Sequence, residues 1–412
     1  MADYFLGLDF GTTGARACVL NEAGEQVFEA RKTYSEATNP QRWHEVLFAL
    51  IGALPSEHCD RLSALAIDGT SGTLLATDAQ LRPLSPALLY DDGRASAEAQ
   101  AISSPQFGAT SGLAKRVWLA AQFPEAAFCF HQSDWLTALL TGKPGITDYH
   151  NALKSGYDIN ALLWPDWVSA LPGGHWQQTV LAPGEIIGHL APEIAKKFHI
   201  NPACIVRAGT TDSIAAFIAS GASQPGDAVT SLGTTLVLKL LSNTRVEDPA
   251  SGVYSHRFGK LWLAGGASNS GGGVLRQFFS NEQLARLSEQ IDPGKPTGLD
   301  YYPLPKIGER FPINDPLLAP RLNPRPENDT LFLHGLLEGI SKIEALGYHK
   351  LKALGASPLI RVFTAGGGAE NEALRLIRQN QLGVPVLRSL HIEAALGTAR
   401  LAKLGNQALP LD

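Results

Sequence analysis

The sequence predicts an α/β protein of two domains that share a duplicated architecture. Strand-like and helix-like segments alternate along the chain, which is typical of α/β folds. The 412 residues exceed what a single hydrophobic core usually holds. A Gly-Thr-Thr turn also lies between two strand-like runs in each half of the chain. We therefore expect two mixed sheets flanked by helices, with a cleft between the domains.

The first half is expected to open with a three-stranded meander followed by a strand–helix–strand unit. The predicted helix covers residues 40–50, because Trp43, Leu47 and Leu50 fall on one helical face. Residues 112–140 are expected to be mostly helical. The predicted strands are short apolar runs bounded by polar or glycine-containing turns, and they are residues 4–9, 15–20, 26–34, 62–68 and 204–208.

The second half repeats this opening after the turn-forming tripeptide at 224–226, which we take as the boundary. The domains are therefore predicted as residues 1–225 and 226–412. Residues 372–379 are expected to be helical, and 303–326, with seven prolines, to form an extended surface segment. The predicted strands of this half are residues 227–232, 236–241, 254–257, 261–264 and 360–364.

Composition excludes several classes of protein. The 34 Lys and Arg residues against 39 Asp and Glu give a net charge of −5, which argues against bulk binding to nucleic acid or an anionic membrane. No apolar run reaches the roughly 18 residues of a membrane span, and the N-terminus lacks the pattern of a secretory signal. The cysteines show no metal-binding or disulfide spacing, so we expect a cytoplasmic location; they are Cys18, Cys59, Cys129 and Cys204.

The two Gly-Thr-Thr turns are candidate phosphate sites. A strand–turn–strand unit of this kind points backbone N–H groups and hydroxyls outward, where they can hold phosphate oxygens. One such turn alone is an ordinary hairpin feature. Two of them, each opening a domain, favour a shared grip on one polyphosphate. The residues concerned are Gly11, Thr12, Thr13, Gly233, Thr234 and Thr235.

Two aspartates stand beside these features. Asp9 directly precedes the first turn, where its carboxylate would repel phosphate unless a divalent cation lay between them, which suggests Mg²⁺ held largely through water. Asp212 ends a buried strand and begins an apolar helix. It is either an ordinary helix N-cap or, at the cleft, an acceptor for a hydroxyl proton.

A third glycine cluster lies between a strand and a helix near the C-terminus. Backbone without side chains approaches a phosphate or flat ring closely, so a nucleotide fits this position. Ordinary helix-start chemistry at 369–371 is the alternative. The spacing does not match the dinucleotide fingerprint GxGxxG in a first strand–helix unit, and the sequence contains no GxxxxGK[ST] P-loop. Both observations disfavour Rossmann and P-loop enzymes. The residues predicted to bind nucleotide are Gly366, Gly367, Gly368 and Asn371.

Five motifs in order resemble those of the FGGY carbohydrate kinases. They are LDFGTTGAR at 8–16, IDGTSG at 67–72, GTTDSIA at 209–215, SLGTT at 231–235 and TAGGGAEN at 364–371. The resemblance covers essentially the whole chain and is greatest to short ribulokinase-like and xylulokinase-like members. It implies the two-domain, ribonuclease H-like fold of the actin, hexokinase and Hsp70 type.

The resemblance also implies roles for single residues. Asp212 matches the catalytic aspartate, which takes the proton of the sugar hydroxyl as that hydroxyl attacks the γ-phosphoryl group of ATP. Asp9 and the two Gly-Thr-Thr turns match the phosphate motifs, and the glycines before Asn371 match the adenosine motif. Ser71 falls in a loop beside the sugar, so the expected substrate contacts are Asp9, Ser71 and Asp212.

These points predict an ATP-dependent, Mg²⁺-dependent sugar kinase that acts on a ketopentose, with D-ribulose ahead of D-xylulose. An aspartate of ordinary pKa suffices as the base, because the transition state of phosphoryl transfer is loose and the hydroxyl loses its proton late. The alternative is a nucleotide-binding ATPase or switch protein of the same fold. Many family members carry a tryptophan in the segment that here reads LYDDGR at 89–94, which leaves the sugar open. Either a monomer or a homodimer is compatible with the sequence.

Overall fold

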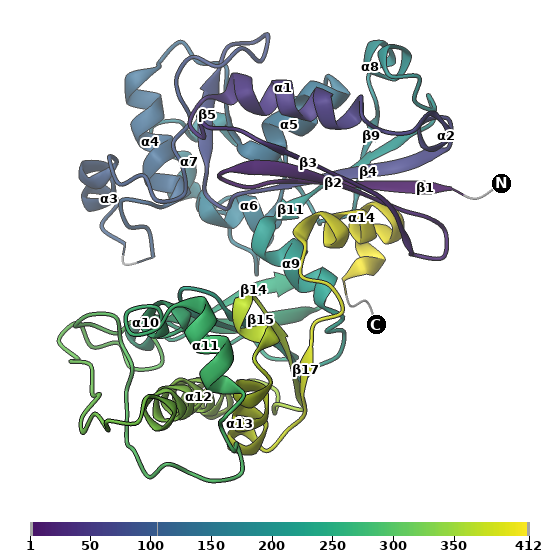
Figure 1. The fold of residues 1–412 in the computed structure, drawn as a ribbon. Coiled ribbons are helices and arrows are strands. Elements are labelled where there is room, and N and C mark those ends of the chain that lie inside the picture. Colours follow the sequence, from purple (N-terminus) through teal and green to yellow (C-terminus); the bar gives the residue numbers. More distant parts are fainter. Residues whose placement is uncertain (1–2, 105, 410–412) are drawn as a thin grey trace. The chain divides into compact units, whose positions relative to one another are not determined.

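The computed structural model describes residues 3–104 and 106–409, and the chain divides into two compact units (Figure 1). Unit 1 comprises the chain up to Ala219 together with the segment that begins at Glu393, and unit 2 comprises Ser220–Ile392. This division differs from the predicted domain 226–412 at its C-terminal end, because the last helix packs with unit 1. Among the described residues, no helix is both long and apolar enough to cross a membrane.

Unit 1 is built on a mixed sheet with the strand order β3-β2-β1-β4-β10-β9, and β11 also pairs with β4. The first three strands form the predicted antiparallel meander, while β4 runs parallel to β1 and β10. The strands are β1 (Tyr4–Phe10), β2 (Gly14–Leu20), β3 (Gln26–Thr33), β4 (Leu62–Gly69), β9 (Ile186–His189), β10 (Ile205–Arg207) and β11 (Thr210–Thr211). The predicted strand at 204–208 did not include β11, in which Thr210 and Thr211 pair with Asp68 and Gly69.

Helices cover both faces of this sheet, with α1 and α5 on one face and α14 on the other (Figure 1). Trp43 of α1 and Trp135 of α5 meet edge to face in the main core, with ring centroids 6.3 Å apart. The predicted helical stretch 112–140 is interrupted by β6. The helices of unit 1 are α1 (Pro40–Ile51), α2 (Ser56–Cys59), α3 (Ser96–Ile102), α4 (Gly112–Gln122), α5 (Gln132–Thr141), α6 (Tyr149–Lys154), α7 (Asp166–Ser169), α8 (Pro192–Lys197), α9 (Asp212–Ser220) and α14 (Ala394–Leu404). Two small sheets pair β5 (Leu74–Thr77) with β6 (Phe128–His131) and β7 (Ile146–Asp148) with β8 (Thr179–Leu181).

Small residues let α14 lie directly on the sheet. A Cβ atom at Gly7 would collide with the backbone carbonyl of Ala395, and one at Gly397 would collide with that of Ala215. The backbone of α14 therefore touches both β1 and α9. This close approach explains why a helix from the end of the chain completes a unit formed by its beginning.

Unit 2 contains a second mixed sheet, with the order β14-β15-β13-β12-β16-β17. Its centre is β12, which runs antiparallel to β13 and parallel to β16. The strands are β12 (Asp227–Leu232), β13 (Leu236–Ser242), β14 (Tyr254–Phe258), β15 (Leu261–Ser268), β16 (Arg361–Ala365) and β17 (Val386–Arg388). The helices are α10 (Gly272–Leu275), α11 (Asn281–Ser288), α12 (Asp329–Ala353) and α13 (Glu372–Leu382). The meander predicted to open this half is present only in its first two strands, because β13 pairs with β15 and β14 lies at the edge beyond β15.

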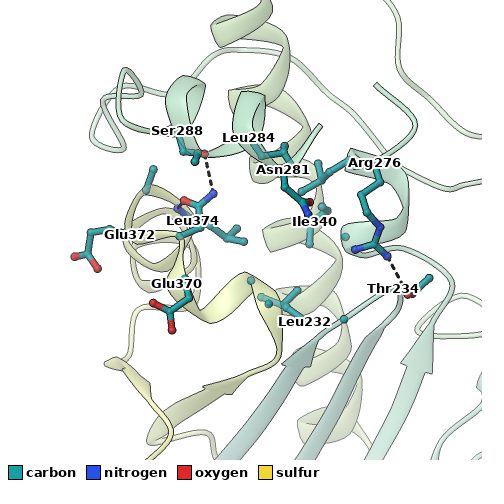
Figure 2. A pocket seen from close by; sticks show the side chains of 18 of the residues that line it. Leu232, Thr234, Arg276, Asn281, Leu284, Ser288, Ile340, Glu370, Glu372 and Leu374 are labelled. Atoms are coloured by element: carbon teal, nitrogen blue, oxygen red, sulfur yellow. Dashed lines mark hydrogen bonds between the residues drawn. The ribbon is translucent and has the colours of Figure 1, made fainter. Parts of the chain in front are cut away.

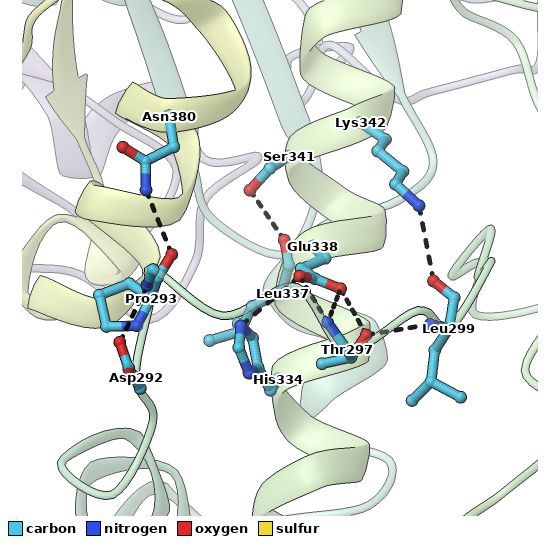
Figure 3. Close-up of polar contacts among 11 residues, drawn as sticks. Asp292, Pro293, Thr297, Leu299, His334, Leu337, Glu338, Ser341, Lys342 and Asn380 are labelled. Atoms are coloured by element: carbon cyan, nitrogen blue, oxygen red, sulfur yellow. Dashed lines mark hydrogen bonds and ion pairs between the residues drawn. The ribbon is translucent and has the colours of Figure 1, made fainter.

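The connection between α11 and α12 is fastened to its surroundings by polar contacts (Figure 3). Glu338 of α12 accepts hydrogen bonds from the hydroxyl and the backbone N–H of Thr297, and Asn380 of α13 donates to the carbonyl of Pro293 at 3.1 Å. Further along, the prediction of a surface segment at 303–326 is wrong for its middle. Glu309 and Phe311 are buried there, because the segment packs against the sheet and α12.

Candidate functional site

Unit 2 holds a cavity of about 830 Å³, within the usual size range of small-ligand sites (Figure 2). It lies where the carboxyl end of β12 meets α10, α11, α12 and the start of α13. Apolar side chains form much of its wall, and polar and charged side chains line the rest. The apolar wall includes Leu232, Leu275, Leu284, Ile340 and Leu374.

The second Gly-Thr-Thr turn forms one side of this cavity through Gly233 and Thr234. The turn is backed by a run of three glycines, in which Gly272 and Gly273 donate backbone hydrogen bonds to the carbonyls of Gly233 (2.9 Å) and Thr234 (3.0 Å). A Cβ atom at Gly271 would lie 2.8 Å from the backbone of Thr235. The sequence reasoning missed this support, although three consecutive glycines before an apolar pair were a visible signal.

The third glycine cluster forms the opposite side of the cavity. Gly367 and Gly368 line it, whereas Gly366, also predicted to bind nucleotide, is not among the lining residues. Gly366 has φ of 82°, and a Cβ atom there would lie 2.8 Å from the carbonyl oxygen of Leu232. Its observed role is to bring the end of β16 close to the end of β12.

Asn371 caps a helix and also lines the cavity. Its Oδ1 atom caps α13 by accepting a hydrogen bond from the N–H of Leu374 at 2.9 Å, so it is a helix-start residue. Its Nδ2 atom donates to Ser288 Oγ of α11 at 2.8 Å, and both side chains line the cavity (Figure 2). The cap therefore holds α11 and α13 together at the cavity wall.

In unit 1, the first Gly-Thr-Thr turn is a tight hairpin between β1 and β2. The Gly11 N–H donates to the carbonyl of Gly14 at 3.0 Å, and Thr12 and Thr13 lie at the tip. Tyr34 binds the hairpin twice, since its N–H donates to the carbonyl of Thr13 at 3.1 Å and its hydroxyl donates to the carbonyl of Gly11. These bonds fix the conformation of the tip.

Asp9 lies opposite Asp68 on the parallel strands β1 and β4. Asp68 is fully buried and accepts a hydrogen bond from the hydroxyl of Thr398 in α14. Burial raises the pKa of Asp68 well above its usual range, and the charge of Asp9 raises it further. Burial also raises the pKa of Asp9, as does the charge of Asp212, while a hydrogen bond with Asp68 and the charge of Arg16 oppose that shift. No local pattern in the sequence predicted this pairing, because it depends on strand register.

Asp212 begins α9 directly after β11 and is partly exposed. Its Oδ1 atom accepts a hydrogen bond from the N–H of Ser213 at 2.6 Å, which orients the carboxylate. Lys154, at the end of α6, lies within electrostatic range of Asp212. Burial lowers the pKa of Lys154 to about 8, although the charge of Asp212 counteracts part of this shift. The sequence reasoning did not single out this lysine.

The loop that carries Ser71 connects β4 to β5 and is held by hydrogen bonds from its neighbours. Gln132 Oε1 accepts from both the N–H (2.9 Å) and the hydroxyl (2.8 Å) of Thr70. The buried ammonium of Lys115 donates to the carbonyls of Gly72 (3.1 Å) and Leu89. Lys115 therefore ties the Ser71 loop to the 89–94 segment, where the sequence departs from the expected family pattern.

Comparisons with known proteins agree with this architecture. Residues 4–219 match the model described as the N-terminal domain of the FGGY family of carbohydrate kinases, and residues 228–405 match that of the C-terminal domain. The xylulose kinase of Escherichia coli (strain K12) is 27% identical, with 97% of this chain and 90% of the relative covered. The gluconokinase of Bacillus subtilis (strain 168) is 22% identical, with 91% and 82% covered.

Among solved structures, a protein described as a xyloylose kinase from Brucella ovis superposes with a TM-score of 0.86. The two chains are 24% identical, and the superposition covers 98% of this chain and 90% of the other. The likeness shows that the fold is of the actin and hexokinase type, as expected from the sequence.

Proposed function

The chain belongs to the FGGY family of carbohydrate kinases, and on that premise we propose that it phosphorylates a ketopentose with Asp212 as the general base. Family membership makes it an ATP-dependent carbohydrate kinase. The single observation that supports the assignment of the base is the position of Asp212. Its oriented carboxylate stands at the end of β11, within electrostatic range of Asp9 and Lys154.

The charges around Asp212 support a neutral sugar as the substrate. Asp9 and Asp212 face Lys154 and Arg16, and Arg16 is already ion-paired with Glu393, so the carboxylate of a sugar acid such as gluconate would meet net repulsion. A ketopentose offers hydroxyls and a carbonyl oxygen, which suit carboxylate acceptors and an ammonium donor. We place D-ribulose ahead of D-xylulose because of the IDGTSG and GTTDSIA motifs. The relative that is named a xylulose kinase supports the same class of sugar.

The proposal assigns the phosphoryl donor to unit 2 and the acceptor to unit 1. In unit 2, the Gly233–Thr234 turn would hold phosphate oxygens, and the apolar wall would receive the adenine ring. In unit 1, Asp212 would accept the proton of the attacking hydroxyl. Thr12 and Thr13 would offer further donors to phosphate at the tip of the first hairpin. Ser71 would contact the sugar from a loop that Lys115 and Gln132 hold in place.

The residues of unit 1 fit Mg²⁺ as the accompanying ion. Within the described part of the chain, no cluster of three or more His, Cys, Asp or Glu residues forms a cage for a metal. Mg²⁺ does not need one, since it keeps several waters and takes one or two carboxylates plus substrate phosphates. Asp9 would hold the ion through water. When bound, the ion neutralises charge on the phosphates.

Replacing Asp212 tests the proposal. Asp212→Asn is expected to lower kcat by about 10²- to 10⁴-fold, the usual contribution of a general base. ADP affinity, measured by calorimetry, should stay near that of the wild type because the nucleotide cavity lies in unit 2. Asp60→Asn, at an exposed aspartate of unit 1, is the matched control and should be fully active. Near-normal turnover in Asp212→Asn would exclude its role as the base.

A coupled assay over several sugars tests the substrate. D-ribulose, D-xylulose, D-gluconate and glycerol should be compared at equal concentration, together with a reaction without sugar. We expect the highest kcat/KM with D-ribulose, followed by D-xylulose. A clear preference for gluconate would overturn the argument from charge. ATP hydrolysis that no sugar stimulates would contradict the proposed function itself.

A further inference from the structure

The charged residues that line the unit 2 cavity are distributed unevenly. Among the described lining residues, Arg276 is the only one with a positive charge, whereas Glu289, Glu370 and Glu372 are acidic. Figure 2 shows Arg276 on the side of the Gly-Thr-Thr turn and the carboxylates of Glu370 and Glu372 on the opposite side. The positive charge among the lining residues therefore lies on the side of the turn, whereas Glu370 and Glu372 on the opposite side are ion-paired with Arg388 and Arg375.

Arg276 is anchored at the turn without being neutralised. It follows α10, and its Nη2 atom donates to Thr234 Oγ1 at 2.9 Å. The side chain is exposed, and in the part of the chain that the structure describes it forms no ion pair with a carboxylate. A guanidinium group has five N–H donors, so most of them stay available for a ligand.

A phosphate group is the ligand that best matches these donors. Guanidinium binds phosphate through paired, charge-assisted hydrogen bonds, and the adjacent turn offers hydroxyl and backbone donors beside it. The far side offers phosphates no cation among the described lining residues, while the apolar wall that includes Leu284 and Ile340 suits a flat ring. The charge pattern thus distinguishes the two ends of a nucleotide.

We propose that Arg276 binds the β- and γ-phosphates of the nucleotide and so sets the direction in which ATP lies in the cavity. This inference rests on the proposed function, since it takes ATP as the ligand. It assigns a role to a residue that the motifs do not include. The adenosine end then lies toward Asn371 and Ser288, and the transferred phosphoryl group lies at the Thr234 turn.

Calorimetric titration with ADP and with AMP separates this role from general support of the fold. In Arg276→Gln, we expect ADP affinity to fall by about 10- to 100-fold, the usual worth of a hydrogen bond to a charged group. AMP affinity should change by less than about threefold, because AMP lacks the β-phosphate. Arg276→Lys, which keeps the charge but loses the paired donors, should give an intermediate ADP affinity. Arg286→Gln is the control, since Arg286 is exposed on α11 and does not line the cavity.

Equal losses for ADP and AMP in Arg276→Gln, or no loss for either, would overturn the inference. Thermal unfolding of each variant checks that the fold is kept, and Arg276→Lys provides a second test if the glutamine variant is unstable. A wild-type protein that binds ADP but phosphorylates no sugar would refute the proposed function and leave this inference standing. A wild-type protein that binds neither nucleotide would overturn both.

Discussion

Breaking the buried ion pair between Glu344 and Arg378 is predicted to destabilise unit 2 severely. Both side chains are fully buried, and Arg378 donates to the two carboxylate oxygens of Glu344 at 2.6 and 2.7 Å. Thr230 of β12 also donates to Glu344, and Arg378 donates to Thr364 of β16. The pair therefore connects α12 and α13 to the two strands whose ends border the unit 2 cavity.

Glu344→Gln keeps the size of the side chain but leaves a buried guanidinium without its counter-charge. Loss of one partner of such a pair costs about 3–5 kcal/mol of unfolding free energy. For a domain of about 150–250 residues, 1 kcal/mol lowers Tm by about 2–4 °C, so the expected drop is about 6–20 °C. Circular dichroism melts and urea titrations of the purified protein measure both quantities.

The double variant Glu344→Met/Arg378→Met tests whether the loss comes from an unpaired charge. Replacing both partners by apolar residues of similar volume is often nearly neutral, so the double variant should be more stable than either single variant. Its ATP affinity should also be closer to that of the wild type than the affinity of either single variant, because α13 and the strand ends would regain their packing. A Glu344→Gln protein within about 1 kcal/mol of the wild type would refute the reasoning. So would a double variant as unstable as the single ones.

Three further predictions concern other parts of the molecule. Lys115→Met removes the ammonium that binds the Ser71 loop. Steady-state kinetics should therefore show a rise of about tenfold in KM for the sugar, with KM for ATP unchanged. An unchanged sugar KM would count against this role. Asn371→Ala should cost about 1 kcal/mol in urea titrations through loss of the helix cap, and an unaltered midpoint would contradict it. Burial lowers the pKa of His131 to about 3 in the folded protein. In the unfolded protein this histidine has the usual pKa near 6.5, so below that pH the unfolded protein binds a proton that the folded protein does not. Stability should therefore fall by about 2 kcal/mol from pH 7.5 to 5, and His131→Gln should show a flatter slope; equal slopes would exclude this cause.

Local patterns in the sequence predicted the strands that open each unit and the helix at Pro40, because apolar periodicity and turn residues determine these elements. The same patterns missed β11, since pairing of Thr210 with Asp68 depends on the neighbouring strand. They also placed the middle of the proline-rich segment at the surface. Burial of Phe311 there results from packing against α12, which no local signal encodes.

The candidate site shows the same division between local and distant signals. Short motifs identified Asp9, Asp212 and the glycine-rich turns as residues worth examining, and their proposed roles await the experiments above. Arg276 and Lys154 escaped notice because a lone basic residue at the end of a helix has no distinctive spacing. Their interest comes from contacts with residues about 40 to 60 positions away in the chain, and only the folded structure shows such contacts.

The packing of α14 on β1 affects how the protein is made in a cell. Unit 1 lacks one of its layers until the ribosome has passed residue 404, after all of unit 2 has been synthesised. Until then, the backbone around Gly7 stays uncovered and the buried carboxyl of Asp68 lacks the hydroxyl of Thr398. A gene fragment that ends near residue 225 would therefore be expected to yield an aggregation-prone polypeptide, even though it encodes the whole of the matched N-terminal family domain.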